Sequence, residues 1–146
     1  MSEINQAHPD VRAVISVNKG LVTQASAAIP VVPLYFAILY KVMKRAGNHE
    51  NCIQQIARLF TQKLYTPEGF RTDENGFIRM DDYELTPEIQ EEVKKCWKAV
   101  TTDTVKEYCD IDGYWEDFYH MFGFRYEDID YTQDVDADIE IDGVVM

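Results

Sequence analysis

The chain lacks the signatures of several classes of protein. It has no CxxC pair, and its three cysteines (Cys52, Cys96 and Cys109) are odd in number and far apart. This pattern favours reduced thiols over a disulfide framework or a metal site. Basic residues are few, 14 Lys and Arg against 26 Asp and Glu, which leaves a net charge of -12. That charge argues against nucleic acid and against an anionic membrane surface, because both attract basic residues.

Motifs for secretion and for dinucleotide binding are also missing. The N-terminus has neither a basic n-region nor an apolar h-region, so it contains no secretory signal, and with reduced thiols we expect a cytoplasmic protein. The sequence contains no GxG, and therefore no Gly-rich turn for a dinucleotide. There is no internal repeat, and 146 residues suggest one domain with its own core.

The stretch from Gly20 to Tyr40 is free of charge and admits two interpretations. A membrane span needs about 20 apolar residues. Here Pro30 and Pro33 interrupt any continuous helix, and the first half contains polar residues. We therefore expect no membrane span, but a ligand-lining loop over residues 20–29 and a core helix from Pro33 to about Lys44.

Hydrophobic periodicity predicts the remaining elements. Val11–Val17 is β-branched and is expected to be a buried strand of the parallel type. Asn75-Gly76 predicts a hairpin over residues 70–80. A short helix is expected after Thr102. The four longer helices are expected to bury Leu34, Tyr35, Ile38, Leu39, Val42 and Met43; Ile53, Ile56, Ala57, Phe60 and Leu64; Ile89, Val93, Cys96, Trp97 and Val100; and Trp115, Phe118, Tyr119 and Phe122.

These elements predict an α/β protein that is mostly helical, with one buried strand and a small hairpin. A lone parallel-type strand cannot cover itself. Either the chain oligomerises or the rest of the sheet belongs to a segment outside it. The segment 134–142 alternates acidic and apolar residues, and is either an edge strand or a solvated acidic tail.

Three patterns suggest chemistry. Tyr40 and Lys44 have the Tyr-x3-Lys spacing of short-chain dehydrogenases, but an ordinary surface pair is favoured because a nucleotide turn is missing. Tyr35 and Lys44 are separated by eight residues, which places them on opposite sides of a helix. Residues 71–82 have a calcium-loop register, but Arg71 stands at the first ligand position, so a plain hairpin is favoured. The scattered histidines favour caps or surface positions, and we expect no metal site and no catalytic residue in this chain.

Several motifs occur in one order along the chain. They are ISVNKGLVTQASAAIPVVPLY (15–35), YKVMKRAGNHENCIQQIARLF (40–60), RMDDYEL (79–85), VTTDTVKEY (100–108), GYWEDFYHMFGF (113–124) and DIDYTQDVD (128–136). Over about residues 11–140 the sequence resembles the C-terminal part of the NADH-dependent trans-2-enoyl-CoA reductases, the FabV-type enoyl-ACP reductases. Residues 1–10 match poorly.

The resemblance implies the C-terminal portion of a Rossmann-type, short-chain-reductase-like fold. It divides the chain into a last Rossmann strand, a cofactor and substrate loop and substrate-lining helices (11–65), a hairpin (66–85), and a helical region with an acidic tail (86–146). It assigns Leu21, Val22 and Thr23 to contact with NAD. It also makes an uncharged acyl pocket from residues that follow them, namely Gln24, Ala25, Ser26, Ile29 and Pro30.

The implied activity is NADH-dependent reduction of an enoyl thioester, carried by CoA or acyl carrier protein, in fatty-acid metabolism. The family's Gly-rich turn and its Tyr-x8-Lys pair lie outside this chain, so we expect it to be inactive without the missing N-terminal part. FAD is implied only by a family description and has no support in the residues. The alternative is a small helical interaction module derived from the fold that has lost catalysis.

Overall fold

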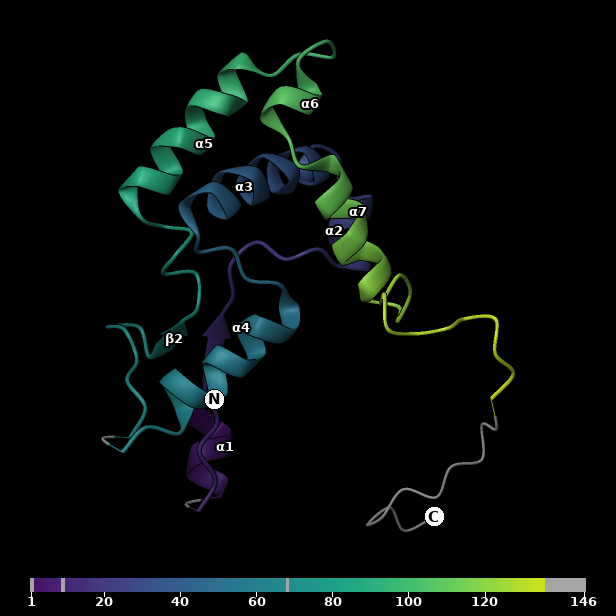
Figure 1. Ribbon diagram of the computed structural model, residues 1–146. Helices are drawn as coiled ribbons and strands as arrows, with labels where there is room; N and C mark the ends of the chain where they lie inside the picture. Colours follow the sequence, from purple (N-terminus) through teal and green to yellow (C-terminus); the bar gives the residue numbers. More distant parts are fainter. Residues whose placement is uncertain (1, 9, 68, 136–146) are drawn as a thin grey trace.

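Helices account for most of the structure, a computed structural model that describes residues 2–8, 10–67 and 69–135 (Figure 1). Two short strands interrupt the series of helices, one after the first helix and one in the middle of the chain. The elements are α1 (Ser2–Ala7), β1 (Ile15–Val17), α2 (Gln24–Ala28), α3 (Val32–Ala46), α4 (Cys52–Arg58), the π-helical η1 (Leu59–Leu64), β2 (Phe77–Arg79), α5 (Pro87–Ala99), α6 (Val105–Tyr108) and α7 (Ile111–His120).

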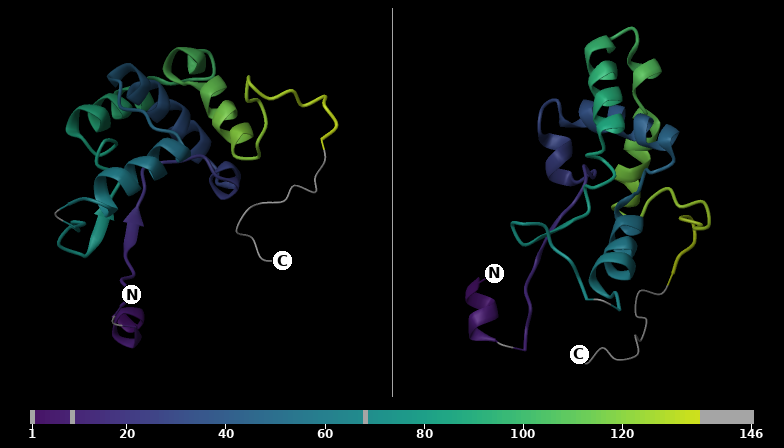
Figure 2. Two further views of the ribbon diagram at one scale, coloured as in Figure 1. Left: turned by 60° about the horizontal axis from the view of Figure 1, so that its bottom comes forward. Right: turned by 90° about the vertical axis from the view of Figure 1, so that its left-hand side faces the viewer.

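Helix α3 is the centre of the core. It lies between α5 and α7, with α2 against it (Figures 1 and 2). Pro33 falls in its first turn, and Gly47 ends it in the left-handed conformation, with φ of 73°. The predicted core helix is confirmed. Its burial is more complete than one stripe, because Phe36, Ala37 and Tyr40 are buried as well.

The predicted α/β class is also confirmed, although the sheet differs from the expectation. It has two strands among the described residues, and β1 and β2 pair in parallel with Ser16 opposite Ile78. The strand at Val11–Val17 is shorter than predicted and is not buried, since Val11 and Ile15 are exposed. No further strand of the described chain lies beside it to cover these side chains.

The predicted hairpin over residues 70–80 is wrong, although its turn is present. The side chain of Asp73 accepts hydrogen bonds from the backbone N–H groups of Asn75 and Phe77, both at 2.9 Å. Gly76 has a φ of 80°, as a left-handed turn position requires. Strand β2 leaves this turn and pairs with β1 instead of a hairpin partner, so the turn signal was correct and the pairing was decided by a distant strand.

Helix α4 presents the opposite face from the one expected. Ile53, Ile56 and Phe60 are exposed, whereas the polar Gln55 and Arg58 are buried. The last helix likewise buries Gly113 and Tyr114 and leaves much of the predicted aromatic stripe exposed, including Trp115 and Phe122. The predicted face of α5 agrees better, with Ile89, Val93 and Cys96 buried and Trp97 partly exposed.

The remaining differences lie at the two ends and in the loop after β1. Residues 2–7 form a helix, and residues 24–28 of the expected loop also form one. The acidic segment 134–142 falls almost wholly outside the described residues. None of the described helices is long and apolar enough to cross a membrane.

The contrast between buried and exposed isoleucines gives a direct test of this core. Ile38 on α3 has no exposed surface, so Ile38→Ala should reduce the free energy of unfolding by about 2–5 kcal/mol through lost burial and the cavity left behind. Ile53→Ala removes the same atoms from a side chain that is 68% exposed, and should change it by less than about 0.5 kcal/mol. Urea unfolding followed by circular dichroism measures both. Similar losses in the two variants would contradict the described packing.

Candidate functional site

The segment between β1 and α2 is held in place by side chains from distant elements. The backbone N–H of Gly20 donates to Glu84 Oε2 at 2.6 Å, and that of Val22 donates to Tyr40 Oη at 3.1 Å. Glu84, in the segment between β2 and α5, also accepts a hydrogen bond from Tyr35 Oη at 2.7 Å. The loop that carries Leu21, Val22 and Thr23 is therefore fixed by α3 on one side and by the β2–α5 connection on the other.

Glycine at position 20 follows from the close approach of α3. A Cβ atom built there would lie 2.6 Å from a ring carbon of Phe36 and 3.2 Å from a methyl of Leu39. A residue with a Cβ atom at this position would force the Phe36 ring or the loop to move.

Thr23 has a structural role that the sequence did not predict. It is the N-cap of α2, and its hydroxyl accepts from the backbone N–H of Ser26 at 3.0 Å. Ser26 Oγ in return accepts from the backbone N–H of Thr23 at 2.8 Å, which completes a capping box. The Thr23 side chain stays exposed at the end of the loop. A hydroxyl has one donor and two acceptor sites, so the cap leaves capacity for a ligand.

Lys19 lies buried beneath this loop. Its ammonium donates to the carbonyl of Gly20 at 3.2 Å and lies 4.9 Å from the centre of the Tyr40 ring. Burial lowers the pKa of Lys19 to about 8, against the attraction of Glu84 and Asp117, which raises it. The side chain thus supplies a cation under the backbone that connects β1 to α2.

Tyr40 does not have the surroundings of a proton donor. It is fully buried, and burial with the nearby Asp117 raises its pKa well above that of a free tyrosine. Lys44 forms an ion pair with Asp110 at 2.6 Å. The Tyr40/Lys44 pair is thus neither catalytic nor the surface pair that we favoured, because each residue has its own partner. Tyr35 and Lys44 also have separate partners, Glu84 and Asp110, as their spacing predicted.

His49 lies against the same network and is not a base of ordinary strength. Its ring packs edge-on to Tyr40 with centroids 4.5 Å apart, and its Nε2 is 4.0 Å from Asp117 Oδ2. Burial, with Lys19 and Lys44 nearby, lowers the pKa of His49 to about 4. The imidazole is therefore neutral at pH 7, and its role is to pack beneath the loop.

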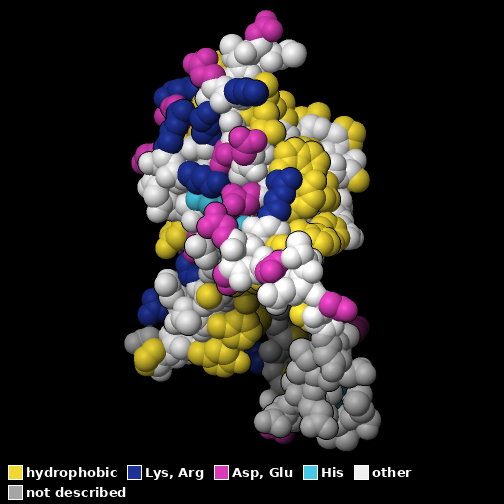
Figure 3. All heavy atoms as spheres, turned by 45° about the vertical axis from the view of Figure 1, so that its right-hand side comes forward, with side chains coloured by type: hydrophobic (Ala, Val, Ile, Leu, Met, Phe, Trp, Pro, Cys, Tyr) yellow, Lys and Arg dark blue, Asp and Glu magenta, His cyan; other side chains and the backbone are white. Residues whose placement is uncertain are grey.

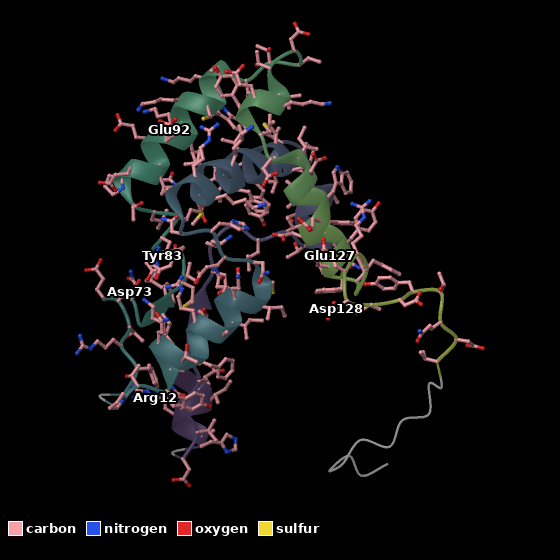
Figure 4. All side chains as sticks on the ribbon, viewed as in Figure 1. Arg12, Asp73, Tyr83, Glu92, Glu127 and Asp128 are labelled. Atoms are coloured by element: carbon pink, nitrogen blue, oxygen red, sulfur yellow. The ribbon has the colours of Figure 1, made fainter. Side chains whose placement is uncertain are left out.

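The calcium-loop register is occupied by ion pairs. Asp73, on the turn before β2 (Figure 4), pairs with Arg79 at 3.3 Å. Asp82 pairs with Arg58 and Lys63 at 2.9 and 2.7 Å. No cluster of residues suited to a metal ion occurs in the described parts of the chain.

Surface depressions occur in at least two places among the described residues. The larger one, of about 840 Å³, lies between α3 and α5 and is lined by Val31, Tyr35 and Trp97 among others. The smaller one, of about 470 Å³, lies between η1 and the turn before β2. Neither contains the residues expected to line the acyl pocket, which lie along α2 and just after it. Those residues are Gln24, Ala25, Ser26, Ile29 and Pro30.

Comparison with known proteins gives matches along nearly the whole chain. Residues 2–65 match the trans-2-enoyl-CoA reductase catalytic region, and residues 72–135 match the enoyl reductase FAD binding domain. An enoyl-[acyl-carrier-protein] reductase [NADH] of Flavobacterium psychrophilum is 47% identical over 134 residues, which are 92% of this chain and 34% of the relative. A trans-2-enoyl-CoA reductase [NADH] of Ruminiclostridium cellulolyticum is 48% identical over 91% of this chain and 33% of the relative.

Solved structures agree with the sequence matches. Trans-2-enoyl-CoA reductase of Clostridium acetobutulicum in complex with NADH superposes with a TM-score of 0.82 at 47% identity, over 92% of this chain and 34% of that one. The Treponema denticola enzyme in complex with NAD gives a TM-score of 0.83 at 47% identity, with the same coverage. The resemblance to the NADH-dependent enoyl reductases is confirmed. The chain spans about a third of the length of these enoyl reductases.

The flavin in the name of the second matched region has no support in the residues. A dinucleotide needs a Gly-rich turn at a helix N-terminus for its pyrophosphate. The glycines of residues 72–135 are Gly76, Gly113 and Gly123, each isolated. These residues therefore offer no pyrophosphate site of this kind for FAD.

Two tyrosines test the support of the loop. Tyr40→Phe removes the acceptor of the Val22 N–H, so a buried donor loses its partner and the free energy of unfolding should fall by about 1–3 kcal/mol. Tyr114 is the matched control, because its buried hydroxyl has no hydrogen-bond partner among the described residues. Tyr114→Phe should be neutral or slightly stabilising. Urea unfolding compares the two variants, and equal effects would contradict the assigned hydrogen bond.

Proposed function

We propose that this chain is the part of an NADH-dependent enoyl-thioester reductase that presents the loop Leu21–Thr23 to the nicotinamide end of the cofactor. The observation that carries the proposal is the clamped loop itself. Gly20 and Val22 are tied to Glu84 and Tyr40, which leaves the exposed Thr23 at its end. The relatives named above are NADH-dependent reductases, and two solved ones hold NADH or NAD.

The chemistry of this loop suits a nicotinamide. A carboxamide needs both a donor and an acceptor, and a hydroxyl such as that of Thr23 offers both. Bound NADH would supply the hydride. The chain's own contribution is to hold the Leu21–Thr23 backbone in one position over α3. It also surrounds the acyl chain with uncharged residues. Rigid positioning of this kind accounts for a large share of catalysis in cofactor enzymes.

The substrate in this proposal is an enoyl thioester, bound along Gln24, Ala25, Ser26, Ile29 and Pro30. These residues carry no charge, as an acyl chain requires. Relatives are named for both CoA and acyl-carrier-protein substrates, so both carriers belong to the proposal. The proposal includes a cytoplasmic location, which the three free thiols support.

The proposal also requires the rest of the reductase. The chain has no Gly-rich turn for the pyrophosphate, and Tyr40 is buried with a raised pKa, so it cannot protonate a substrate. Proton transfer and pyrophosphate binding would come from the two thirds of the reductase that lie outside the match.

The isolated chain and a chimera test the function together. With crotonyl-CoA, the isolated chain should oxidise no more NADH than a control without protein, because it lacks the pyrophosphate-binding turn and an accessible proton donor. The chimera replaces the matching segment of the Ruminiclostridium cellulolyticum reductase with this chain and should turn over. NADH absorbance measures both. A folded chimera without activity would support instead the non-catalytic interaction module.

Thr23 gives the sharpest test within the chimera. Thr23→Val removes the hydroxyl offered to the cofactor, and kcat/KM should fall by about two- to tenfold, as expected for one hydrogen bond. It also removes the cap of α2, which costs about 0.5–2 kcal/mol of stability. The kinetics must therefore be measured well below the melting temperature.

Two controls separate the effects. Asn51→Ala breaks the equivalent capping box at the start of α4, a helix that carries none of the proposed cofactor contacts, and should reduce stability with unchanged kinetics. Thr61→Val removes a hydroxyl bonded only to the Ala57 carbonyl and should also leave the kinetics unchanged. If Thr23→Val and Asn51→Ala affect kcat/KM alike, the assignment of Thr23 to the cofactor is wrong.

A further inference from the structure

Lys19 is a buried cation that forms no ion pair in the described chain. On the face shown in Figure 3, Lys and Arg side chains (dark blue) lie at the surface among Asp and Glu side chains (magenta). Lys19 differs from these, because it is only 3% exposed. Within the described residues its ammonium donates to one acceptor, the carbonyl of Gly20 at 3.2 Å. Taking a cation out of water is costly, so this lysine is a candidate for a functional role.

The hydrogen bond from Lys19 fixes one peptide group of the proposed cofactor loop. The described chain contains no cis peptide bond, so the carbonyl of Gly20 and the N–H of Leu21 point in opposite directions. The carbonyl points to the buried ammonium, and the Leu21 N–H therefore points away from it. This N–H has no acceptor among the described residues, whereas the N–H groups of Gly20 and Val22 donate to Glu84 and Tyr40. The loop thus has one free donor between two occupied ones.

The charge of Lys19 strengthens this free donor. A cation bound to a carbonyl oxygen draws electron density from the nitrogen of the same peptide group, and hydrogen bonds linked in this way reinforce one another in a low-dielectric interior. A charge-assisted hydrogen bond is roughly twice as strong as a neutral one. A neutral lysine amine would polarise the Gly20 carbonyl much less. The strength of the Leu21 N–H as a donor therefore depends on the charge of Lys19.

We propose that Lys19 is a positioning residue of the reductase, which fixes and polarises the Gly20–Leu21 peptide group so that the Leu21 N–H binds the carbonyl oxygen of a bound reactant. The inference rests on the proposed function, which brings the nicotinamide carboxamide to this loop. The carboxamide oxygen is therefore the expected acceptor. The carbonyl oxygen of the enoyl thioester is the other oxygen of the same chemistry, and the experiments below distinguish the two.

Groups from several elements surround the ammonium and set its charge. They come from α3, the segment after it, α4, the segment between β2 and α5, and α7, and they are Tyr40, His49, Glu50, Arg58, Glu84 and Asp117. Burial lowers the pKa of Lys19 to about 8. The pKa of His49 is lowered to about 4 and that of Tyr40 is raised well above its ordinary value, so neither group changes charge near pH 8. Lys19 is charged below about pH 8 and neutral above it.

The lowered pKa affects ligand binding and stability in opposite directions. Polarisation of the peptide group is present below pH 8 and is lost above it, so affinity for the reactant should fall as the pH rises. The unfolded chain binds the proton of Lys19 more tightly than the folded chain does. The contribution of this group to stability therefore increases between pH 8 and the ordinary pKa of lysine. A loss of affinity at alkaline pH is thus distinguishable from unfolding.

The full isolated chain tests the geometry without a cofactor. In carbon-detected NMR, the carbonyl carbon of Gly20 and the Cε of Lys19 should titrate with one midpoint, near pH 8. Under mildly acidic conditions the Leu21 amide should exchange at least about tenfold faster than the hydrogen-bonded amides of Gly20 and Val22. A Gly20 carbonyl that does not follow Lys19, or a protected Leu21 amide, would overturn the inference.

Lys19→Met in the chimera described above keeps the length of the side chain and removes its charge. KM for NADH should rise about three- to tenfold with unchanged kcat, because this hydrogen bond is made equally in the ground state and the transition state. With thio-NADH, whose carboxamide oxygen is replaced by sulfur, a weak acceptor, the rise should be less than about twofold. A loop that had only loosened would raise KM for both cofactors alike.

Two further outcomes identify the acceptor or exclude it. If Lys19→Met instead raises KM for crotonyl-CoA, by the same factor with either cofactor, the Leu21 N–H binds the thioester carbonyl. If neither KM changes, the role of Lys19 is wrong.

Lys41→Met is the matched control. The Lys41 ammonium also donates to backbone carbonyls, those of Lys106 at 2.8 Å and Cys109 at 3.4 Å, but these lie on and just after α6. The substitution should leave both KM values unchanged. Equal effects of Lys41→Met and Lys19→Met would contradict a specific role of Lys19.

The unaltered chimera provides a test that needs no substitution at Lys19. Its KM for NADH should rise by about three- to tenfold from about pH 7 to about pH 9.5, and its KM for thio-NADH should rise less. A ratio of the KM values for the two cofactors that stays constant over this range would overturn the carboxamide as the acceptor. If KM for crotonyl-CoA is also constant, the inference as a whole is overturned.

The two proposals fail in different ways. A folded chimera without activity contradicts the proposed function, and with it this inference. An active chimera in which Lys19→Met behaves like Lys41→Met contradicts only the role of Lys19.

Discussion

The burial of α3 is the interaction on which the rest of the structure depends. Ile38, Leu39, Tyr40 and Met43 have no exposed surface, and the helix is enclosed by α5, α7 and α2. Because close packing leaves little freedom to such a helix, its side chains become fixed points for neighbouring segments. Tyr40 holds the loop directly through Val22, and Tyr35 holds it through Glu84, which accepts from Gly20.

The polar groups beneath the loop form a network rather than separate pairs. Lys19, Tyr40, His49 and Asp117 are close together, and burial shifts each pKa towards the neutral form of the group. In the low-dielectric interior each of these groups depends on its partners. A network of this kind defines one backbone arrangement, which is what a segment that meets a cofactor requires. It does not offer a proton donor near its ordinary pKa.

The two groups of buried charges, around Lys19 and around Arg58, have different effects on the structure. The network around Lys19 supports a loop that points outward, whereas the ion pairs of Arg58 hold α4 with its apolar face outward. Both follow from buried charge that must be paired, and neither could be recognised from the spacing of apolar residues.

The sequence by itself determined the longer helices, the ends of α3 and the family. Pro33 and Gly47 delimit α3, and Asn75-Gly76 forms a turn, because these are local preferences of the backbone. The candidate loop was identified only through resemblance. Tertiary structure decided which partner β2 pairs with and which face of α4 and α7 is buried. It also decided that Tyr40 supports Val22. These depend on contacts between residues far apart in the chain, such as Arg58 with Asp82 and Gly20 with Glu84, whose energies no local pattern encodes.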